Sequence, residues 1–184
     1  MGEVSWGDVD EYWSNRWLYT KSGAHSHFFE ERVFGSRLDL PERPTRREFA
    51  ENVRECMVAA GEPIVDAGLS WKLEHGKTRA IYSCDTGSYF TFDYLLRPIE
   101  KAWRNREVLL NPGGVREDTM YADLARGECK LMIDYDDFNS QHTIEAMQCV
   151  IEEACVGAPP HVLKWAVESF RNMFVHWTDE RDIS

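Results

Sequence analysis

The segment from Leu131 to Ser140 joins an apolar run to three carboxylates within four residues. Alternation over residues 129–135 predicts a strand, because its apolar side chains fall on one face and Asp134 falls on the other. Negative charge gathered at a strand end costs free energy through repulsion and desolvation unless a cation offsets it. Because Mg²⁺ is usually held by one or two carboxylates together with substrate phosphates, the segment predicts half of a metal–phosphate site, with Asp134 as the first ligand.

The same carboxylates have a second interpretation. Asp136 and Asp137 can form a solvated turn and cap a helix that begins near residue 140. The local pattern leaves both interpretations open for Asp134, and it favours the capping role for the other two. Asn139 is similarly either a helix cap or a polar group close to the metal that can hydrogen-bond a sugar hydroxyl.

Residues 72–81 predict a cationic hairpin. Gly76 permits a tight turn between two extended arms, so that three cations converge: Lys72, Lys77 and Arg79. Arginine offers phosphate a two-pronged hydrogen-bonding group, and lysine offers a compact charge. The alternative is an ordinary charged hairpin on the surface. A P-loop is excluded, because Trp71 stands where that motif requires its first glycine.

A third polar segment is the predicted loop Ser22–His27. Its small residues, Ser22, Gly23 and Ala24, would let a nucleic-acid backbone approach closely. His25 and His27 could serve as metal ligands, although such an isolated pair in a loop is more often polar surface.

Composition limits the class of protein. A chain of 184 residues can bury the core of one domain, and its net charge of −11 argues against a protein that simply coats nucleic acid. A nucleic-acid enzyme remains compatible, because charge is local and Arg43, Arg46 and Arg47 form a basic cluster. The five cysteines contain no CxxC pair, which argues against a disulfide framework or a cysteine-rich zinc site and favours a reducing compartment.

Local patterns predict an α+β unit that is rich in helices and has few strands. Thr45 and Glu48 form a capping box at the start of a helix over 45–60. A strand over 78–84 is followed by a helical pattern over 88–104 that Pro98 interrupts or kinks. Two further helices are expected, one over 140–155 and one that starts at Pro159-Pro160 and continues to Trp177.

Taken together, these elements resemble viral RNA-dependent RNA polymerases. A basic hairpin followed about 55 residues later by a strand-borne carboxylate is the order found there. The similarity is greatest to the totivirus-like group, the double-stranded RNA viruses of fungi and protozoa. Residues 134–143 resemble motif A of that group and residues 72–81 resemble motif F, the cationic fingertip hairpin. Residues 92–98 also resemble the group, and residues 22–26 resemble motif G.

The resemblance covers about residues 12–177 and implies part of a right-hand polymerase. Residues 1–128 would form a helix-rich fingers region, and residues 129–184 would begin the palm with its first strand and the following helices. It implies a division of roles among the site residues. Asp134 would bind catalytic Mg²⁺ or Mn²⁺, and Asn139 would lie near the ribose. The incoming ribonucleoside triphosphate would be held by Lys72, Lys77 and Arg79, and the RNA template by Ser22, Gly23 and Ala24.

The chain departs from the family pattern in one respect. No Ser-Gly…Thr…Asn motif B or Gly-Asp-Asp motif C follows residue 143. Because a two-metal mechanism needs carboxylates on both sides of the ions, we expect the chain alone to be inactive and to require the rest of a polymerase or a second chain with motifs B and C. Viral capsid protein is a further expected partner, and no membrane is expected. The expected location is the host cytoplasm, with the interior of the viral particle as an alternative.

Two other functions stay open on the sequence. The chain could be a non-catalytic RNA- or protein-binding remnant of a viral polymerase. It could also be an unrelated metal-dependent nuclease or hydrolase, since those sites likewise need clustered carboxylates.

Overall fold

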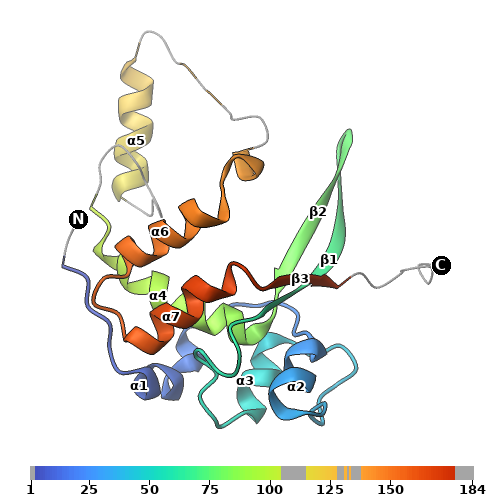
Figure 1. The fold of residues 1–184 in the computed structure, drawn as a ribbon. Coiled ribbons are helices and arrows are strands. Elements are labelled where there is room, and N and C mark those ends of the chain that lie inside the picture. The colour runs from blue at the N-terminus through green and yellow to red at the C-terminus, as the bar shows by residue number, and fades with distance from the viewer. Residues whose placement is uncertain (1–2, 105–114, 128–130, 132, 134–137, 177–184) are drawn as a thin grey trace.

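A computed structural model describes residues 3–104, 115–127, 131, 133 and 138–176 (Figure 1). The helices are α1 (Val9–Ser14), α2 (His27–Phe34), α3 (Arg46–Asn52), α4 (Thr86–Ala102), α5 (Val115–Arg126), α6 (Ile144–Ala154) and α7 (Pro160–Ser169). Short 3₁₀ turns are η1 (Arg16–Leu18) and η2 (Phe138–Gln141), and the strands are β1 (Val65–Glu74), β2 (Lys77–Cys84) and β3 (Met173–His176). This mixture of helices and one small sheet is compatible with the predicted α+β class.

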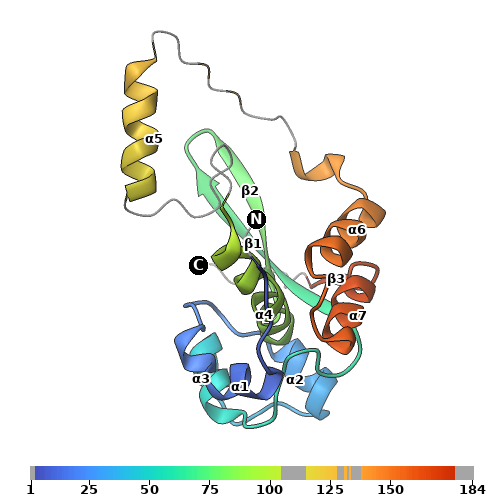
Figure 2. The same ribbon diagram turned by 90° about the vertical axis from the view of Figure 1, so that its left-hand side faces the viewer.

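The sheet has the strand order β2-β1-β3. Strands β1 and β2 are antiparallel and are joined at His75 and Gly76, where Gly76 has a φ of 80°, a conformation that favours glycine. The predicted strand over 78–84 and its preceding turn are therefore confirmed. Figure 1 and Figure 2 show that this hairpin extends away from the helices α1, α2 and α3, so that its turn lies far from them.

Helix α4 lies at the centre of the core. The Asp85 carboxylate caps its N-terminus by accepting a hydrogen bond from the Ser88 N–H at 2.8 Å. Phe90 and Leu95 on this helix are completely buried. The helix runs through Pro98 without ending there, so the predicted interruption is wrong, and the alternative of a kink at this proline stays a prediction.

Helix α3 is shorter than the helix predicted over 45–60. Its capping box at Thr45 is present, but the helix ends at Asn52. The reason is a distant side chain, because the buried Arg16 guanidinium donates to the carbonyl oxygens of Ala50 and Val53 at 2.9 and 3.1 Å. These bonds satisfy helix-end carbonyl groups that would otherwise need the next helical turn.

Helix α6 begins at Ile144, four residues after the predicted start at 140. The Thr143 hydroxyl caps it by accepting a hydrogen bond from the Ala146 N–H at 3.2 Å. The interpretation of Asn139 as the cap of this helix is therefore wrong, and η2 occupies that position instead. Asp136 and Asp137 lie outside the described residues.

Helix α7 begins with Pro160 in its first turn, as predicted, but it ends at Ser169 instead of continuing to 177. The chain then enters β3, which pairs in parallel with β1, and the Val65 N–H donates to the Asn172 carbonyl oxygen at 3.0 Å. Phe174, which falls within the predicted helix, lies on this strand with half of its surface exposed. Backbone pairing with β1 therefore takes the place of the last turns of the predicted helix.

The predicted palm strand over 129–135 falls mostly outside the described residues. Leu131 and Ile133 are described, and neither is assigned to a strand. Both side chains are exposed. Within the described part of the chain, no helix combines the length and apolar character that crossing a bilayer requires.

Candidate nucleotide and template site

The predicted cations come together on one face of the β1–β2 hairpin. Lys72 lies opposite Arg79 and Glu74 lies opposite Lys77, and alternation puts these four residues on the same face. The Glu74 carboxylate accepts from Lys72 Nζ at 2.8 Å and from Arg79 Nε at 3.1 Å. The sequence therefore predicted the cationic cluster correctly, but it missed the carboxylate that holds two of its members.

The cations alter the charge state of this carboxylate. The hydrogen bond from Lys72, together with the charges of Arg79 and Lys77, lowers the pKa of Glu74. Glu74 is therefore ionised at neutral pH. The side chains of Lys72 and Arg79 are more than half exposed, so an anion arriving from solvent can reach them.

The other face of the hairpin is apolar. Trp71 and Leu73 on β1 and Tyr82 on β2 are all more than half exposed. Register places Leu69 opposite Tyr82 and Trp71 opposite Ala80, so these side chains share one surface. The hairpin thus separates a cationic face from an apolar one.

A partly buried network anchors the base of the hairpin. The Asp66 carboxylate accepts from Arg32 Nε at 3.0 Å and lies 2.8 Å from His176 Nε2 on β3. The Asp66 N–H donates to the Asp85 carboxylate at the start of α4. Burial raises the pKa of Asp85, against hydrogen bonds from Ser88 and Asp66 that lower it. Helix α2, helix α4 and strand β3 thereby set the position of the hairpin.

The predicted template loop is held next to a cation. Ala24 pairs with Thr45 in an isolated bridge, and the Gly23 carbonyl oxygen accepts from the Arg46 N–H at 2.9 Å. A Cβ at position 23 would lie 2.9 Å from a guanidinium nitrogen of Arg46. That guanidinium stacks over the Tyr89 ring, 3.9 Å from its centroid. A side chain at position 23 would therefore have to displace the guanidinium of Arg46.

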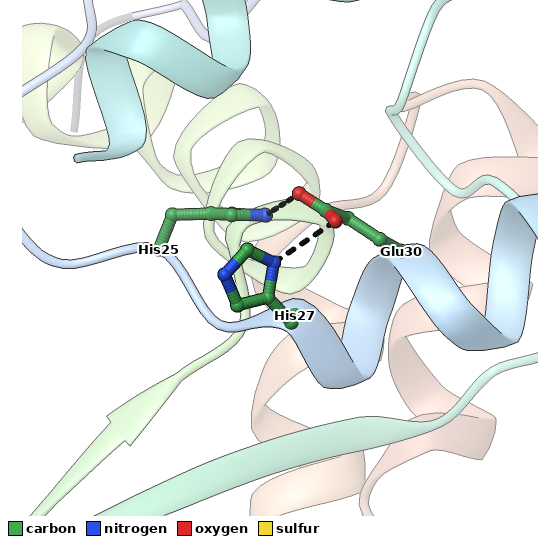
Figure 3. A group of neighbouring side chains, drawn as sticks. All are labelled: His25, His27 and Glu30. Carbon is green, nitrogen blue, oxygen red and sulfur yellow. Dashed lines mark hydrogen bonds and ion pairs between the residues drawn. The ribbon is translucent and has the colours of Figure 1, made fainter. Parts of the chain in front are cut away.

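The two histidines that follow this loop converge on one carboxylate (Figure 3). His25 Nε2 lies 2.8 Å from Glu30 Oε1, and His27 Nδ1 lies 3.0 Å from Glu30 Oε2. The side chains of His25 and Glu30 have no exposed surface. The interpretation of His25 as polar surface is therefore wrong, and no pattern in the sequence indicated Glu30.

Burial and hydrogen bonding act against each other in this cluster. Burial lowers the pKa of His25, although Glu30 favours its protonated form. Burial also acts to raise the pKa of Glu30, but hydrogen bonds from His27, Leu38 and His25 outweigh it, and the pKa of that carboxyl is lowered. Glu30 is therefore a buried carboxylate anion.

A cavity of about 480 Å³ lies elsewhere, between the N-terminal segment and the end of α4. Tyr12, Tyr19, Arg97 and Lys101 contribute to its lining. It contains none of the predicted site residues, and the sequence patterns did not indicate it.

The remaining predicted site residues are not placed by the structure. Asp134 lies outside the described residues. Asn139 has a described backbone within η2, and its side chain is not described. The expected pairing of Asp134 with the hairpin cations therefore stays a prediction.

Comparison with known proteins identifies the class of the chain. Residues 2–182 match the family described as viral RNA-directed RNA-polymerase, and the chain belongs to that family. The predicted resemblance to polymerases of the totivirus-like group is thereby confirmed, since similar proteins occur in double-stranded RNA viruses of this kind. No solved structure matches the chain.

Particular relatives support the same assignment. The chain is 38% identical over 179 residues to a probable RNA-directed RNA polymerase of Helminthosporium victoriae virus-190S, covering 92% of this chain and 21% of that protein. It is 34% identical over 185 residues to the corresponding protein of Leishmania RNA virus 1 - 1, covering 92% and 20%. For Saccharomyces cerevisiae virus L-A the identity is 28% over 193 residues, covering 94% and 12%. The chain thus spans about a fifth or less of the length of these relatives.

Proposed function

We propose that this chain is the part of an RNA-directed RNA polymerase that receives the incoming ribonucleotide and guides the template. The observation that carries the proposal is the gathering of Lys72, Lys77 and Arg79 on one exposed hairpin face, in a chain that belongs to the viral polymerase family. Exposed, convergent cations are what a triphosphate requires.

In the reaction, an RNA 3′-hydroxyl attacks the α-phosphate of the ribonucleotide and pyrophosphate leaves. Lys72, Lys77 and Arg79 would neutralise the triphosphate and orient it for in-line attack. Glu74 already occupies two of these cations, so the nucleotide must compete with a carboxylate for them. This competition would keep the hairpin from binding anions indiscriminately.

The proposed metal ligand is Asp134, whose carboxylate oxygens suit Mg²⁺ or Mn²⁺. Such an ion would activate the nucleophile and stabilise charge on the leaving oxygens. The cluster of His25, His27 and Glu30 does not fit this role, because Mg²⁺ prefers oxygen ligands and two of these groups are imidazoles. Asn139 would contact the ribose hydroxyl.

The template would pass along the Ser22–Ala24 loop. Contacts from backbone N–H groups there carry no sequence preference, which suits an enzyme that must copy any template. Arg46, positioned against Gly23 and Tyr89, would supply a positive charge beside that path.

We further propose that the chain alone does not polymerise, because Asp134 supplies carboxylate on only one side of the metal pair. The rest of the polymerase, or a second chain with motifs B and C, would supply the other side. RNA, ribonucleotides and viral capsid protein are its proposed partners, in the host cytoplasm or inside the viral particle.

Nucleotide binding tests the assignment. Binding of a fluorescent ribonucleoside triphosphate with Mg²⁺ should weaken about tenfold or more in Lys77→Glu/Arg79→Glu, since charge reversal converts attraction to repulsion. The matched control is Arg126→Glu/Lys164→Glu, which changes the net charge equally on the exposed surfaces of α5 and α7. Equal weakening in both variants would contradict a specific site. No effect in either would favour the non-catalytic remnant.

Catalysis is tested separately with RNA-templated incorporation of labelled nucleotides. The chain with Mg²⁺ should give no product until a polypeptide carrying motifs B and C is added, and Asp134→Ala should abolish the restored activity. Robust synthesis by the chain alone would overturn its proposed dependence on a partner. RNA cleavage without nucleotides would favour the nuclease alternative.

A further inference from the structure

We propose that His25, His27 and Glu30 form a transition-metal site, suited to Zn²⁺, that is separate from the magnesium chemistry of polymerisation. One ligand atom from each residue can be chosen so that all lie within 4.8 Å of one another. Figure 3 shows both imidazole rings directed at the Glu30 carboxylate, His25 from the loop before α2, and His27 and Glu30 from the first turn of α2.

The donor atoms select the metal. Zn²⁺ binds imidazole nitrogen and carboxylate oxygen at about 2.0–2.2 Å, and two histidines with one glutamate are a known zinc ligand set that leaves a fourth position open. His27 retains 21% side-chain exposure, whereas His25 and Glu30 have none. The fourth position can therefore be reached by a water molecule from the side of His27.

Charge balance favours a cation at this position. Among the described residues, Glu30 forms its ion pairs with the two histidines and with no lysine or arginine. A buried carboxylate is costly unless a compensating charge lies beside it. A divalent cation between the three side chains would supply that charge at the point where the hydrogen bonds now converge.

Neighbouring groups orient the ligands as metal sites require. His25 Nδ1 lies 2.7 Å from Thr86 Oγ1 on α4, so the ring presents Nε2 to Glu30. The Leu38 N–H donates to Glu30 Oε2 at 2.9 Å, which steadies the carboxylate and leaves Oε1 toward His25. In metalloproteins, hydrogen bonds from neighbouring groups of this kind fix the orientation of the histidines and carboxylates that bind the metal.

A bound ion would tie the loop that contains Gly23 to helix α2 and, through Thr86, to helix α4. Because metal binds the folded site and not the unfolded chain to the same extent, it should raise the melting temperature. The role inferred for the ion is structural, and it lies beside the proposed template loop.

The test is zinc titration of chain stripped of metal with a chelator and dialysed, followed by calorimetry and metal analysis. One Zn²⁺ should bind per chain, and excess Mg²⁺ should not displace it. His27→Gln should weaken binding by about tenfold or more, because even outer-shell changes commonly cost that much. The matched control is His161→Gln on the exposed side of α7, which should bind zinc as the unaltered chain does.

His27 is chosen because its partial exposure should let the variant fold, which far-ultraviolet circular dichroism without metal will verify. Co²⁺ substitution identifies the ligands, since tetrahedral nitrogen and oxygen ligation lacks the intense thiolate charge-transfer band. That band would reveal capture by free thiols such as Cys149 and would overturn the proposal. Absence of stoichiometric zinc binding, or equal affinity in the His27 and His161 variants, would overturn it too. Nucleotide binding by the hairpin does not enter these readouts.

Discussion

Lys72 and Arg79 lie directly opposite each other on β1 and β2, and both donate to the carboxylate of Glu74. The cationic face of the hairpin is therefore partly neutralised before any anion arrives. Glu74 therefore places a negative charge within the site that we propose for phosphate, and removing that charge should change anion binding.

Glu74→Gln should strengthen binding of a ribonucleoside triphosphate several-fold at low ionic strength. The substitution keeps the shape of the side chain and removes the charge that competes with phosphate. The increase in affinity should be smaller at about 0.15 M salt, because interactions between exposed charges more than about 8 Å apart are then largely screened. Fluorescence titration at two salt concentrations measures both effects.

The control for that experiment is Glu168→Gln, which removes an equal charge beside Lys164 on α7. It should leave nucleotide affinity unchanged. Equal strengthening by both variants would mean that net charge, not the hairpin, governs binding. The melting temperature should hardly change in either, because exposed ion pairs contribute little to folding.

Gly87→Ala should destabilise the core. A Cβ at this position would lie 2.1 Å from the ring of Phe29, a side chain that is 1% exposed, so the buried ring would have to shift. Overpacking of this kind costs about 1–3 kcal/mol or more. Chemical denaturation measures the loss. Gly68→Ala on β1, where nothing lies within 4 Å, should cost far less, and equal losses would contradict the packing argument.

Arg16→Met should destabilise the chain by about 3 kcal/mol, because it removes charged hydrogen bonds and leaves buried carbonyl groups without a donor. The affected acceptors are the carbonyl oxygens of Trp13, Ala50 and Val53. Urea denaturation gives the free energy of unfolding. Arg54→Met removes an exposed guanidinium nearby and should change that free energy little. Similar losses in the two variants would contradict a special role for Arg16.

Asp85 should make stability depend on pH. Burial raises its pKa in the folded chain above the ordinary value near 3.9, so the folded state holds the proton more tightly than the unfolded state. The contribution of this group to stability is full below the unfolded pKa and is lost as pH rises through the folded pKa.

Denaturation at a series of pH values tests that sign. Relative to Asp85→Asn, the unaltered chain should lose stability as the pH rises from about 4 toward neutrality. The variant keeps a carbonyl acceptor for Ser88 and Asp66, so its cap should survive in part. A pH-independent difference between the two proteins would contradict the raised pKa.

Several features that depend on contacts within a few residues were predicted correctly from the sequence, although the start of α6 at its Thr143 cap was not. The capping box of Thr45 with Glu48, the turn at Gly76 and the helix start at Pro160 are examples. Each follows from backbone geometry or a hydrogen bond that spans at most four residues. The family and the convergence of the hairpin cations were also predicted, because both are carried by short contiguous motifs.

Features that depend on distant contacts were missed. Arg16 ends α3 from 34 residues away, and His25 is buried through a contact with Thr86 across 61 residues. The predicted end of α7 was wrong, because β1 offers backbone partners to residues 173–176. In each case the sequence around the affected residue contains no periodic pattern that points to its distant partner.

The sequence by itself determined where α3 and α7 begin, which cations share a hairpin and to which polymerase family the chain belongs. Only the tertiary structure decided where α3 and α7 end, which carboxylate restrains the cations and which side chains surround Glu30. The physical reason is that a helix start or a turn is stabilised by its own neighbours, whereas burial and cross-strand pairing are stabilised by groups that only the folded chain brings near.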